Sequence, residues 1–417
     1  VSEKSSAKFI AGYATTYQHF TNDSISDADA SKYPYQYADF ETGKLALQLS
    51  YLHKFSAKNN IQAGISYENT QFRTIFKEMH PAMPDIVYED QNGSMGLEQA
   101  YIQWKHRFTK DLSLVAGLHG QFLDINNSVA IEPRAALRYS FNVRNAISIG
   151  YGMHSQAQNV YTYFVQTPSG TGIAYTNKNL DFTRSQQVIA AYDLNISASV
   201  RVKAEAYYQM LDNVPVTQAS GSFSSLNSGA DFGLDNEDSL KSKGTGYNYG
   251  AEITIEHFLK KGFYFLATGS LINSRYKGSD GVERNTAFNT GHVFNLLLGK
   301  EFKVGKKGSV LGLNLKVSEI GGRYLTPLDL NASQAAGKAV YMNSFAYSVK
   351  QDDYFRTDLK ISYKREYRHS TLECSIDLEN ITNNKNIFNQ SYDKRTNRIV
   401  NNYQQGFFPV PTFRYTF

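Results

Sequence analysis

Apolar and polar residues alternate with a period of two along most of the chain. In the segment 43–55, Leu45, Leu47 and Leu49 share one face, and the other face carries Lys44, Gln48 and Ser50. Because successive side chains of a β-strand point to opposite faces, this pattern predicts strands with one apolar face. Sixteen strands are predicted, near residues 7–19, 43–55, 61–77, 96–108, 112–125, 130–141, 146–154, 184–195, 200–212, 246–258, 262–276, 288–302, 309–319, 355–366, 371–382 and 403–417.

The connections between these strands differ in length in a regular way. Every second connection is a short polar turn, at 56–60, 109–111, 142–145, 196–199, 259–261, 303–308 and 367–370. Most of the others are long loops, at 20–42, 78–95, 155–183, 213–245, 320–354 and 383–402, while 126–129 and 277–287 are shorter. Short turns at one end and long loops at the other are typical of an outer-membrane barrel, with the turns periplasmic and the loops extracellular. Many strands also exceed the ~5–6 residues of a usual soluble strand.

An aromatic residue stands at or near the strand end before most short turns. These residues are Phe55, Phe108, Phe141, Phe258, Phe302 and Tyr367. A ring of aromatics at one membrane interface explains the repetition, because an aromatic side chain suits a partly wet boundary. Ordinary core aromatics at strand ends are the alternative.

The composition agrees with a barrel and excludes several other classes. Hydrophobic residues make up 41% of the chain, but 30 Tyr and 26 Phe are present. No apolar run of about 18 residues exists, so no transmembrane helix is expected. The net charge of +5 gives no reason to expect a nucleic-acid partner. The single Cys374 excludes an internal disulfide and a cysteine-based metal cluster.

Many charged residues fall on the face opposite the apolar one. They are Glu132, Arg134, Arg138, Arg201, Lys203, Glu205, Glu252, Glu256, Arg356, Asp358, Lys360, Glu373, Asp377 and Glu379. A dry core would impose a heavy desolvation cost on so many charges. We therefore expect this face to line a water-filled lumen or to contact a polar plug.

Candidate chemistry is sparse. No catalytic constellation, cofactor motif or metal motif stands out, so neither an enzyme nor a cofactor is predicted. The carboxylates of the 213–245 loop (Asp231, Asp235, Glu237 and Asp238) are expected to be solvated rather than to hold calcium. Aromatic residues in two long loops are the candidate ligand contacts: Tyr161, Tyr163, Phe164, Tyr175, Tyr324 and Tyr341. Stacking on a ligand and packing of the loops against one another are both open.

The last strand has an aromatic ending. The segment 406–417 reads GFFPVPTFRYTF, and Phe413, Tyr415 and Phe417 alternate with polar residues. We expect these three aromatics to face lipid and Arg414 to face the lumen.

The residues 379–417 resemble the end of a TonB-dependent outer-membrane receptor, of the type found in Bacteroidota. The family often has L-x-N-[IL]-T-N before the last loop, as at 378–383, and a closing strand with prolines and a final aromatic, here Pro409, Pro411, Arg414 and Phe417. The segment 179–214 is similar to the family's recurring strand pair. The resemblance implies a 22-stranded barrel with an N-terminal plug, located in the bacterial outer membrane.

The resemblance also implies a function and partners. The family imports siderophores, haem, cobalamin, glycans or peptides by energised transport through TonB-ExbB-ExbD, which contacts the plug. A surface lipoprotein lid is a further partner of such receptors, and Phe413, Tyr415 and Phe417 would be read by the barrel-assembly machinery.

The chain departs from the family in its strand count. Sixteen strands equal the last sixteen of twenty-two, and no plug domain or first strands are apparent before them. We therefore expect residues 1–417 to form one barrel domain, completed by a plug or strands from elsewhere in the same or another chain, or closed by itself. A sixteen-stranded passive porin or a scaffold barrel that binds surface partners is the alternative function.

Overall fold

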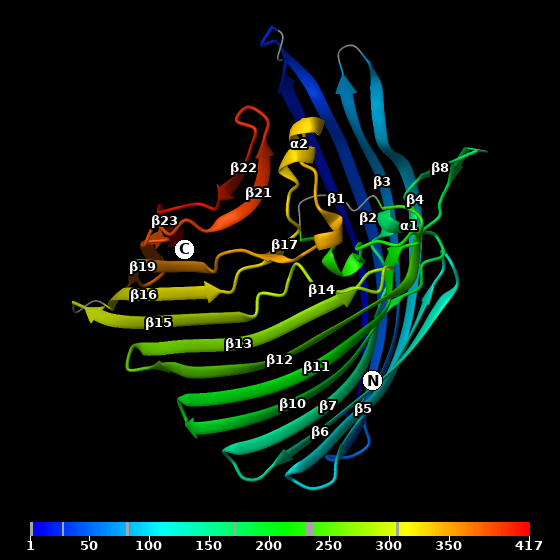
Figure 1. The fold of residues 1–417 in the computed structure, drawn as a ribbon. Helices are drawn as coiled ribbons and strands as arrows, with labels where there is room; N and C mark the ends of the chain where they lie inside the picture. The colour runs from blue at the N-terminus through cyan, green and yellow to red at the C-terminus, as the bar shows by residue number, and fades with distance from the viewer. Residues whose placement is uncertain (1–2, 27–28, 81–82, 171, 231–236, 306–307) are drawn as a thin grey trace. The chain divides into compact units, whose positions relative to one another are not determined.

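The computed structural model describes residues 3–26, 29–80, 83–170, 172–230, 237–305 and 308–417. Seventeen strands belong to one large antiparallel sheet (Figure 1). They are β1 (Ser5–Ile25), β2 (Lys32–Lys54), β3 (Asn59–His80), β4 (Met83–Arg107), β5 (Leu112–Leu123), β6 (Ser128–Ser140), β7 (Asn145–Gln156), β10 (Thr183–Ser197), β11 (Val200–Thr217), β12 (Leu240–Lys260), β13 (Phe263–Lys277), β14 (Glu283–Asn285), β15 (His292–Val304), β16 (Ser309–Ile320), β19 (Tyr354–Glu366), β20 (Thr371–Glu379) and β23 (Phe408–Thr416). The fold is all-β, and the sixteen predicted strands are confirmed, with the three-residue β14 in addition.

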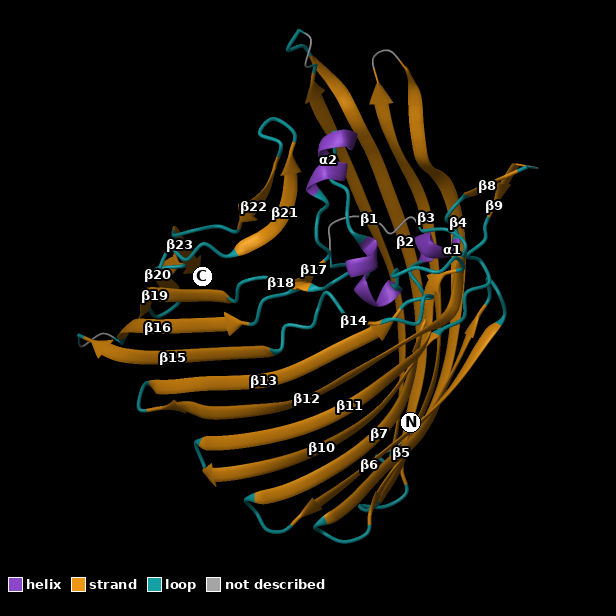
Figure 2. Cartoon of the chain, in the orientation of Figure 1, coloured by secondary structure: helices purple, strands orange, loops and turns teal. Residues whose placement is uncertain are grey.

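Helices and short strand pairs are confined to the connections (Figure 2). They are α1 (Val160–Tyr163), η1 (Ser225–Asn227), α2 (Leu330–Ala336), η2 (Asn343–Phe345), and the strand pairs β8–β9 (Thr167–Ser169, Gly172–Ala174), β17–β18 (Tyr324–Leu325, Val349–Lys350) and β21–β22 (Ile387–Asp393, Arg398–Tyr403). Among the described residues, no helix is both long enough and apolar enough to cross a membrane.

The chain divides into two compact units. The first comprises 1–137, 150–187 and 211–245, and the second comprises 138–149, 188–210 and 246–417. In the first unit, β1 to β5 pair antiparallel in chain order. In the second unit, the antiparallel order is β13, β15, β16, β19, β20, β23.

Two of the predicted long loops are wrong. Strands β1 and β2 stay paired from Ser5↔His53 up to Ile25↔Lys32, so most of 20–42 is strand. Strands β3 and β4 likewise stay paired up to His80↔Met83, so 78–95 is also mostly strand. Pro34 in β2 and Pro84 in β4, together with many polar residues, gave these segments the composition of loops.

The start of the final strand also differs from the prediction. Residues expected to lie in the 383–402 loop form the β21–β22 hairpin, with Ile387 opposite Tyr403. The closing strand β23 therefore starts at Phe408 rather than at residue 403.

The short turns are confirmed among the described residues, and residues 306 and 307 of the turn predicted at 303–308 lie outside them. Three of the turns close in the same way. Ser56 Oγ accepts hydrogen bonds from the backbone N–H groups of Lys58 and Asn59. Thr109 Oγ1 and Asn142 Oδ1 accept from the residues two and three positions after them. Such side-chain-capped turns let a strand reverse within a few residues.

The face that the sequence marks as apolar is exposed in the structure. The six aromatics before the short turns are all exposed: Phe55, Phe108, Phe141, Phe258, Phe302 and Tyr367. In the first unit Leu45, Leu47 and Leu49 of β2 are exposed as well. Large apolar side chains in such number on a surface are typical of strands whose outer face contacts lipid. We call this the outward face and the opposite one the inward face.

Candidate functional site

The aromatic residues of the 155–183 loop pack onto the inward face of the first unit. Asn159 Oδ1 accepts from Tyr161 N at 3.2 Å and starts the one-turn helix α1. The ring of Tyr161 lies 5.1 Å from that of Phe72 on β3, and its hydroxyl is 2.6 Å from Thr42 Oγ1 on β2. The loop is therefore fastened to strands β2 and β3 by an aromatic contact and a hydrogen bond.

Tyr163 belongs to a small apolar core. This core consists of Leu123, Tyr163, Leu180, Phe182 and Leu240. Tyr163 is fully buried, and its hydroxyl accepts from Gln158 N at 3.1 Å. Burial raises the pKa of Tyr163 to about 12, because the phenolate would lose its hydration. The side chain has no exposed surface to offer a ligand.

The other predicted ligand contacts differ in exposure. Phe164 packs on Phe72, with ring centroids 5.0 Å apart, whereas Tyr175 is exposed. In the second unit, Tyr324 is half-buried and pairs with Lys350 in the β17–β18 pair. Tyr341 is exposed and bridges to Leu328 through the backbone. Ligand contact thus stays a prediction, with Tyr175 and Tyr341 the most accessible of the six.

The acidic residues of the 213–245 loop are only partly placed. Asp231 and Asp235 lie outside the described residues. Glu237 is exposed, and its backbone carbonyl accepts from the Asn177 amide at 2.8 Å.

The inward-face charges form pairs along the strands. Asp193 on β10 contacts Arg138 at 2.7 Å and Arg201 at 2.8 Å. Lys360 on β19 contacts Asp377 on β20 at 2.9 Å. The acidic members are mostly shielded, while the two arginines remain about half exposed. Such pairing lowers the cost of placing charges on this face and leaves positive surface available to another molecule.

Glu132 is the most deeply buried of these charges. In the first unit its side chain is fully buried and accepts from Ser155 N at 2.6 Å and from Gln121 Nε2 at 2.5 Å. His119 Nδ1 and Arg134 also lie within hydrogen-bonding distance, at 2.8 and 2.5 Å. The sequence predicted Glu132 and Arg134 on this face of one strand. It did not predict the contacts from β5 and β7, because those strands are separate from β6.

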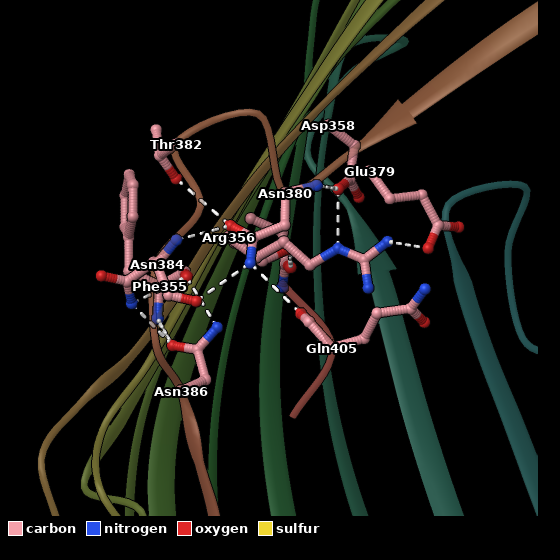
Figure 3. A network of polar contacts seen from close by, with 11 residues as sticks. Phe355, Arg356, Asp358, Glu379, Asn380, Thr382, Asn384, Asn386 and Gln405 are labelled. Carbon is pink, nitrogen blue, oxygen red and sulfur yellow. Dashed lines mark hydrogen bonds and ion pairs between the residues drawn. The ribbon is translucent and has the colours of Figure 1, made fainter. Parts of the chain in front are cut away.

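A dense polar network surrounds the Asn380 motif, residues 378–383, at the start of β19 and the end of β20 (Figure 3). The Arg356 guanidinium lies 2.6 Å from Asp358 and 3.2 Å from Glu379. Asn380 N donates to Asp358 at 2.8 Å. The Asn380 side chain donates to the carbonyls of Asn384 and Gln405, at 3.0 and 3.3 Å. The network ties the end of β20 to the segment that leads into β23.

Asn386 completes this network through hydrogen bonds to the backbone of Phe355 on β19. Its amide nitrogen donates to Phe355 O at 2.9 Å, and its amide oxygen accepts from Phe355 N at 2.9 Å. The side chain thereby imitates a neighbouring strand and satisfies both backbone groups. From the sequence, residues 378–383 were recognised only as a family motif. The run of asparagines beyond the strand end was the sequence signal for their role in satisfying backbone groups.

The C-terminal strand presents its aromatics outward. β23 pairs with β20 from Glu379↔Phe408 to Thr371↔Thr416. Phe413, Tyr415 and Phe417 are 72%, 53% and 98% exposed. Arg414 lies on the other face, 3.9 Å from Glu373. The recognition of this ending by the assembly machinery stays a prediction.

Long antiparallel strands, an exposed aromatic outward face, a charged inward face and short turns at one end are the features of an outer-membrane β-barrel. The chain belongs to the TonB-dependent receptor family: residues 3–383 match the family described as TonB dependent receptor-like, beta-barrel. No curated protein matches the chain.

Solved structures share this fold at low sequence identity. The ferric preacinetobactin receptor BauA of Acinetobacter baumannii is 12% identical, with a TM-score of 0.66 over 99% of this chain and 60% of its own. The ferric yersiniabactin uptake receptor FyuA of Yersinia pestis is 12% identical, with a TM-score of 0.69 over 100% and 60%. The pyoverdine receptor FpvA of Pseudomonas aeruginosa is 14% identical, with a TM-score of 0.70 over 99% and 59%. The chain thus spans about 60% of the length of these receptors.

Proposed function

We propose that this chain is the barrel portion of an importer that takes up a scarce nutrient across the outer membrane by energised transport. The observation that carries the proposal is the family match over residues 3–383. In this proposal a plug domain contacts the inward face, and TonB-ExbB-ExbD act on the plug. The exposed surfaces of Arg138 and Arg201 support a plug contact, because paired but accessible guanidinium groups can accept acidic partners.

Ferric siderophores are the substrate class to test first. Three structural neighbours are receptors for ligands of this class, named as ferric preacinetobactin, ferric yersiniabactin and pyoverdine. At 12–14% identity these neighbours support the fold alone, so haem, cobalamin, glycans and peptides stay in the test panel. A surface lipoprotein lid stays among the proposed partners.

A transport assay separates the importer from a passive porin. The gene that encodes this chain would be deleted, and accumulation of labelled ferric siderophores measured with and without a functional TonB. An importer loses accumulation both in the deletion strain and in the TonB-deficient strain. Accumulation that survives loss of TonB, together with diffusion of small sugars through the purified protein, would establish the porin instead.

Two loop variants test where the ligand binds. Tyr175→Ala and Tyr341→Ala remove exposed aromatic surface and should weaken ligand binding at an unchanged amount of folded protein. Phe164→Leu is the matched control, because Phe164 packs against Phe72 and a change there should act through loop packing. Unaltered affinity in both alanine variants would remove these two tyrosines from the site.

A further inference from the structure

Three potential metal ligands meet at the ends of β15, β16 and β19 in the second unit. His292 Nε2 lies 3.9 Å from Glu319 Oε1 and 3.7 Å from Asp353 Oδ2. One ligand atom from each residue lies within 4.8 Å of the other two. A tetrahedral ion bound at about 2.0–2.2 Å holds its ligand atoms about 3.3 Å apart. Small side-chain rotations would therefore bring these three atoms to coordination distance.

The three residues lie on the outward face, just beyond its apolar rows. The strand register places Phe294, Glu319 and Phe355 side by side in one row. Both phenylalanines are exposed, as expected for side chains that face lipid. His292, the first residue of β15, stands two residues before Phe294, so strand alternation puts it on the same face. Asp353 lies just before β19, and its Oδ2 is 3.7 Å from His292 Nε2. The cluster thus lies where the lipid-facing surface gives way to polar surroundings.

The backbone orients Asp353 for binding. Asp353 Oδ1 accepts from Gly322 N at 2.8 Å, and Lys350 Nζ lies 3.6 Å from the same oxygen. The other oxygen, Oδ2, is the one that faces His292. Carboxylates that bind metals are commonly oriented by a hydrogen bond of this kind.

Two glycines allow the three strand ends to converge. Gly321 N donates to His292 O at 2.9 Å. A Cβ atom on Gly321 would lie 1.9 Å from Thr290 O, and one on Gly322 would lie 1.8 Å from Gln351 O. Any other residue at either position would push the end of β16 away from β15 or β19. The close approach of these backbones is therefore built into the sequence.

We propose that His292, Glu319 and Asp353 bind a divalent transition-metal ion that ties together the ends of β15, β16 and β19 on the outward face. One imidazole and two carboxylates form a donor set that suits ions such as Zn²⁺, and three protein ligands leave a coordination position open. The ion would offset the repulsion between the two carboxylates. Because it binds only the folded arrangement, it would also stabilise these strand ends.

Calorimetric titration of Zn²⁺ into the whole protein, purified in detergent without a polyhistidine tag, tests the proposal. We expect one Zn²⁺ site whose affinity falls at least tenfold in each of His292→Gln, Glu319→Gln and Asp353→Asn. Co²⁺ should give the intense visible absorption of a tetrahedral site in the unaltered protein and not in these variants. His369→Gln, which alters an exposed histidine in a short turn, should leave both signals unchanged.

Each contrary result has a defined meaning. Loss of binding only in His292→Gln would identify a single surface histidine and overturn the proposal. Equally tight Ca²⁺ binding that depends on Glu319 and Asp353 but not on His292 would also overturn it. Folding of every variant is checked by heat-modifiable migration on gels. Glu319→Gln alone decides the question if Asp353→Asn fails to fold, because the Glu319 side chain is largely exposed.

Discussion

Replacing Asn380 by alanine should destabilise the folded protein more than its position at a strand end suggests. The residue is buried and has a left-handed backbone, with a φ of 48°. Its side chain donates to Asn384 O and Gln405 O, and its oxygen accepts from Asn384 N at 3.0 Å. Alanine would remove these hydrogen bonds from partly buried backbone groups and would adopt the left-handed conformation at a cost.

The magnitude follows from these contacts. The two partly buried hydrogen bonds at 3.0 Å contribute about 1 kcal/mol each. The left-handed backbone adds about 1 kcal/mol for alanine relative to asparagine. The free energy of unfolding should therefore fall by about 3 kcal/mol in Asn380→Ala. Asn380→Gly keeps the loss of hydrogen bonds but relieves the backbone, so its fall should be about 2 kcal/mol.

Urea unfolding followed by tryptophan fluorescence measures this difference, because Trp104 is the only tryptophan in the chain. Heat-modifiable migration on gels provides a second readout of the folded state. Asn397→Ala is the control, since Asn397 has a φ of 52° but lies exposed in the turn between β21 and β22. The hydrogen bond that its side chain accepts from the Tyr392 hydroxyl, at 2.6 Å, is exposed as well. If Asn380→Ala and Asn397→Ala destabilise the protein equally, backbone strain accounts for the effect at Asn380. The argument that its partly buried hydrogen bonds dominate would then be refuted.

Three further outcomes are expected. Deleting Phe417 should lower the amount of assembled protein in the outer membrane, measured by heat-modifiable migration, while transport per folded molecule stays the same; equal amounts would refute this. The raised pKa of Tyr163 in the folded state favours the neutral phenol, so the unaltered protein should lose stability as the pH rises from about 10 to about 12. Tyr163→Phe should remove this loss, and unfolding scans across this pH range show whether it disappears. Asp280 pairs with Arg284 at 2.7 Å, and this hydrogen-bonded pairing lowers the pKa of Asp280. The loop that it holds should therefore lose protection from proteolysis as the pH falls below about 4, and Asp280→Asn should show reduced protection already at neutral pH.

Local patterns account for much of the fold. Alternation along β2, β16 and β19 predicts strands, because side-chain direction depends only on position along the strand. The short turns could equally be predicted from the sequence, because Ser56, Thr109 and Asn142 each cap a turn within three residues. The parts of β1 to β4 within 20–42 and 78–95 were not predicted, because Pro34 and Pro84 and the adjacent polar residues are typical of loops. These residues are paired because the strand register continues from the residues next to them, and the apolar–polar alternation gives no information about register.

The candidate sites depend on contacts that no local pattern contains. The hydrogen bond of the Tyr163 hydroxyl and the contact of Glu132 with His119 depend on which strands and loops meet in the fold. The same holds for His292, Glu319 and Asp353, which come from three different strand ends. Each of these residues taken alone has an ordinary sequence context. Their chemistry arises from the register between strands that are distant along the chain.

The Asn380 motif explains why membership of the family is easier to recognise than the substrate. Its side chains satisfy backbone groups at the end of β20, at the start of β19 and before β23, none of which depends on the cargo. A barrel must satisfy these groups whichever nutrient it carries, because unpaired backbone groups near the membrane are costly. A motif with such a role identifies the architecture. In the proposed importer, cargo recognition would fall to exposed surfaces such as those of Tyr175 and Tyr341, where the fold places no comparable demand on the sequence.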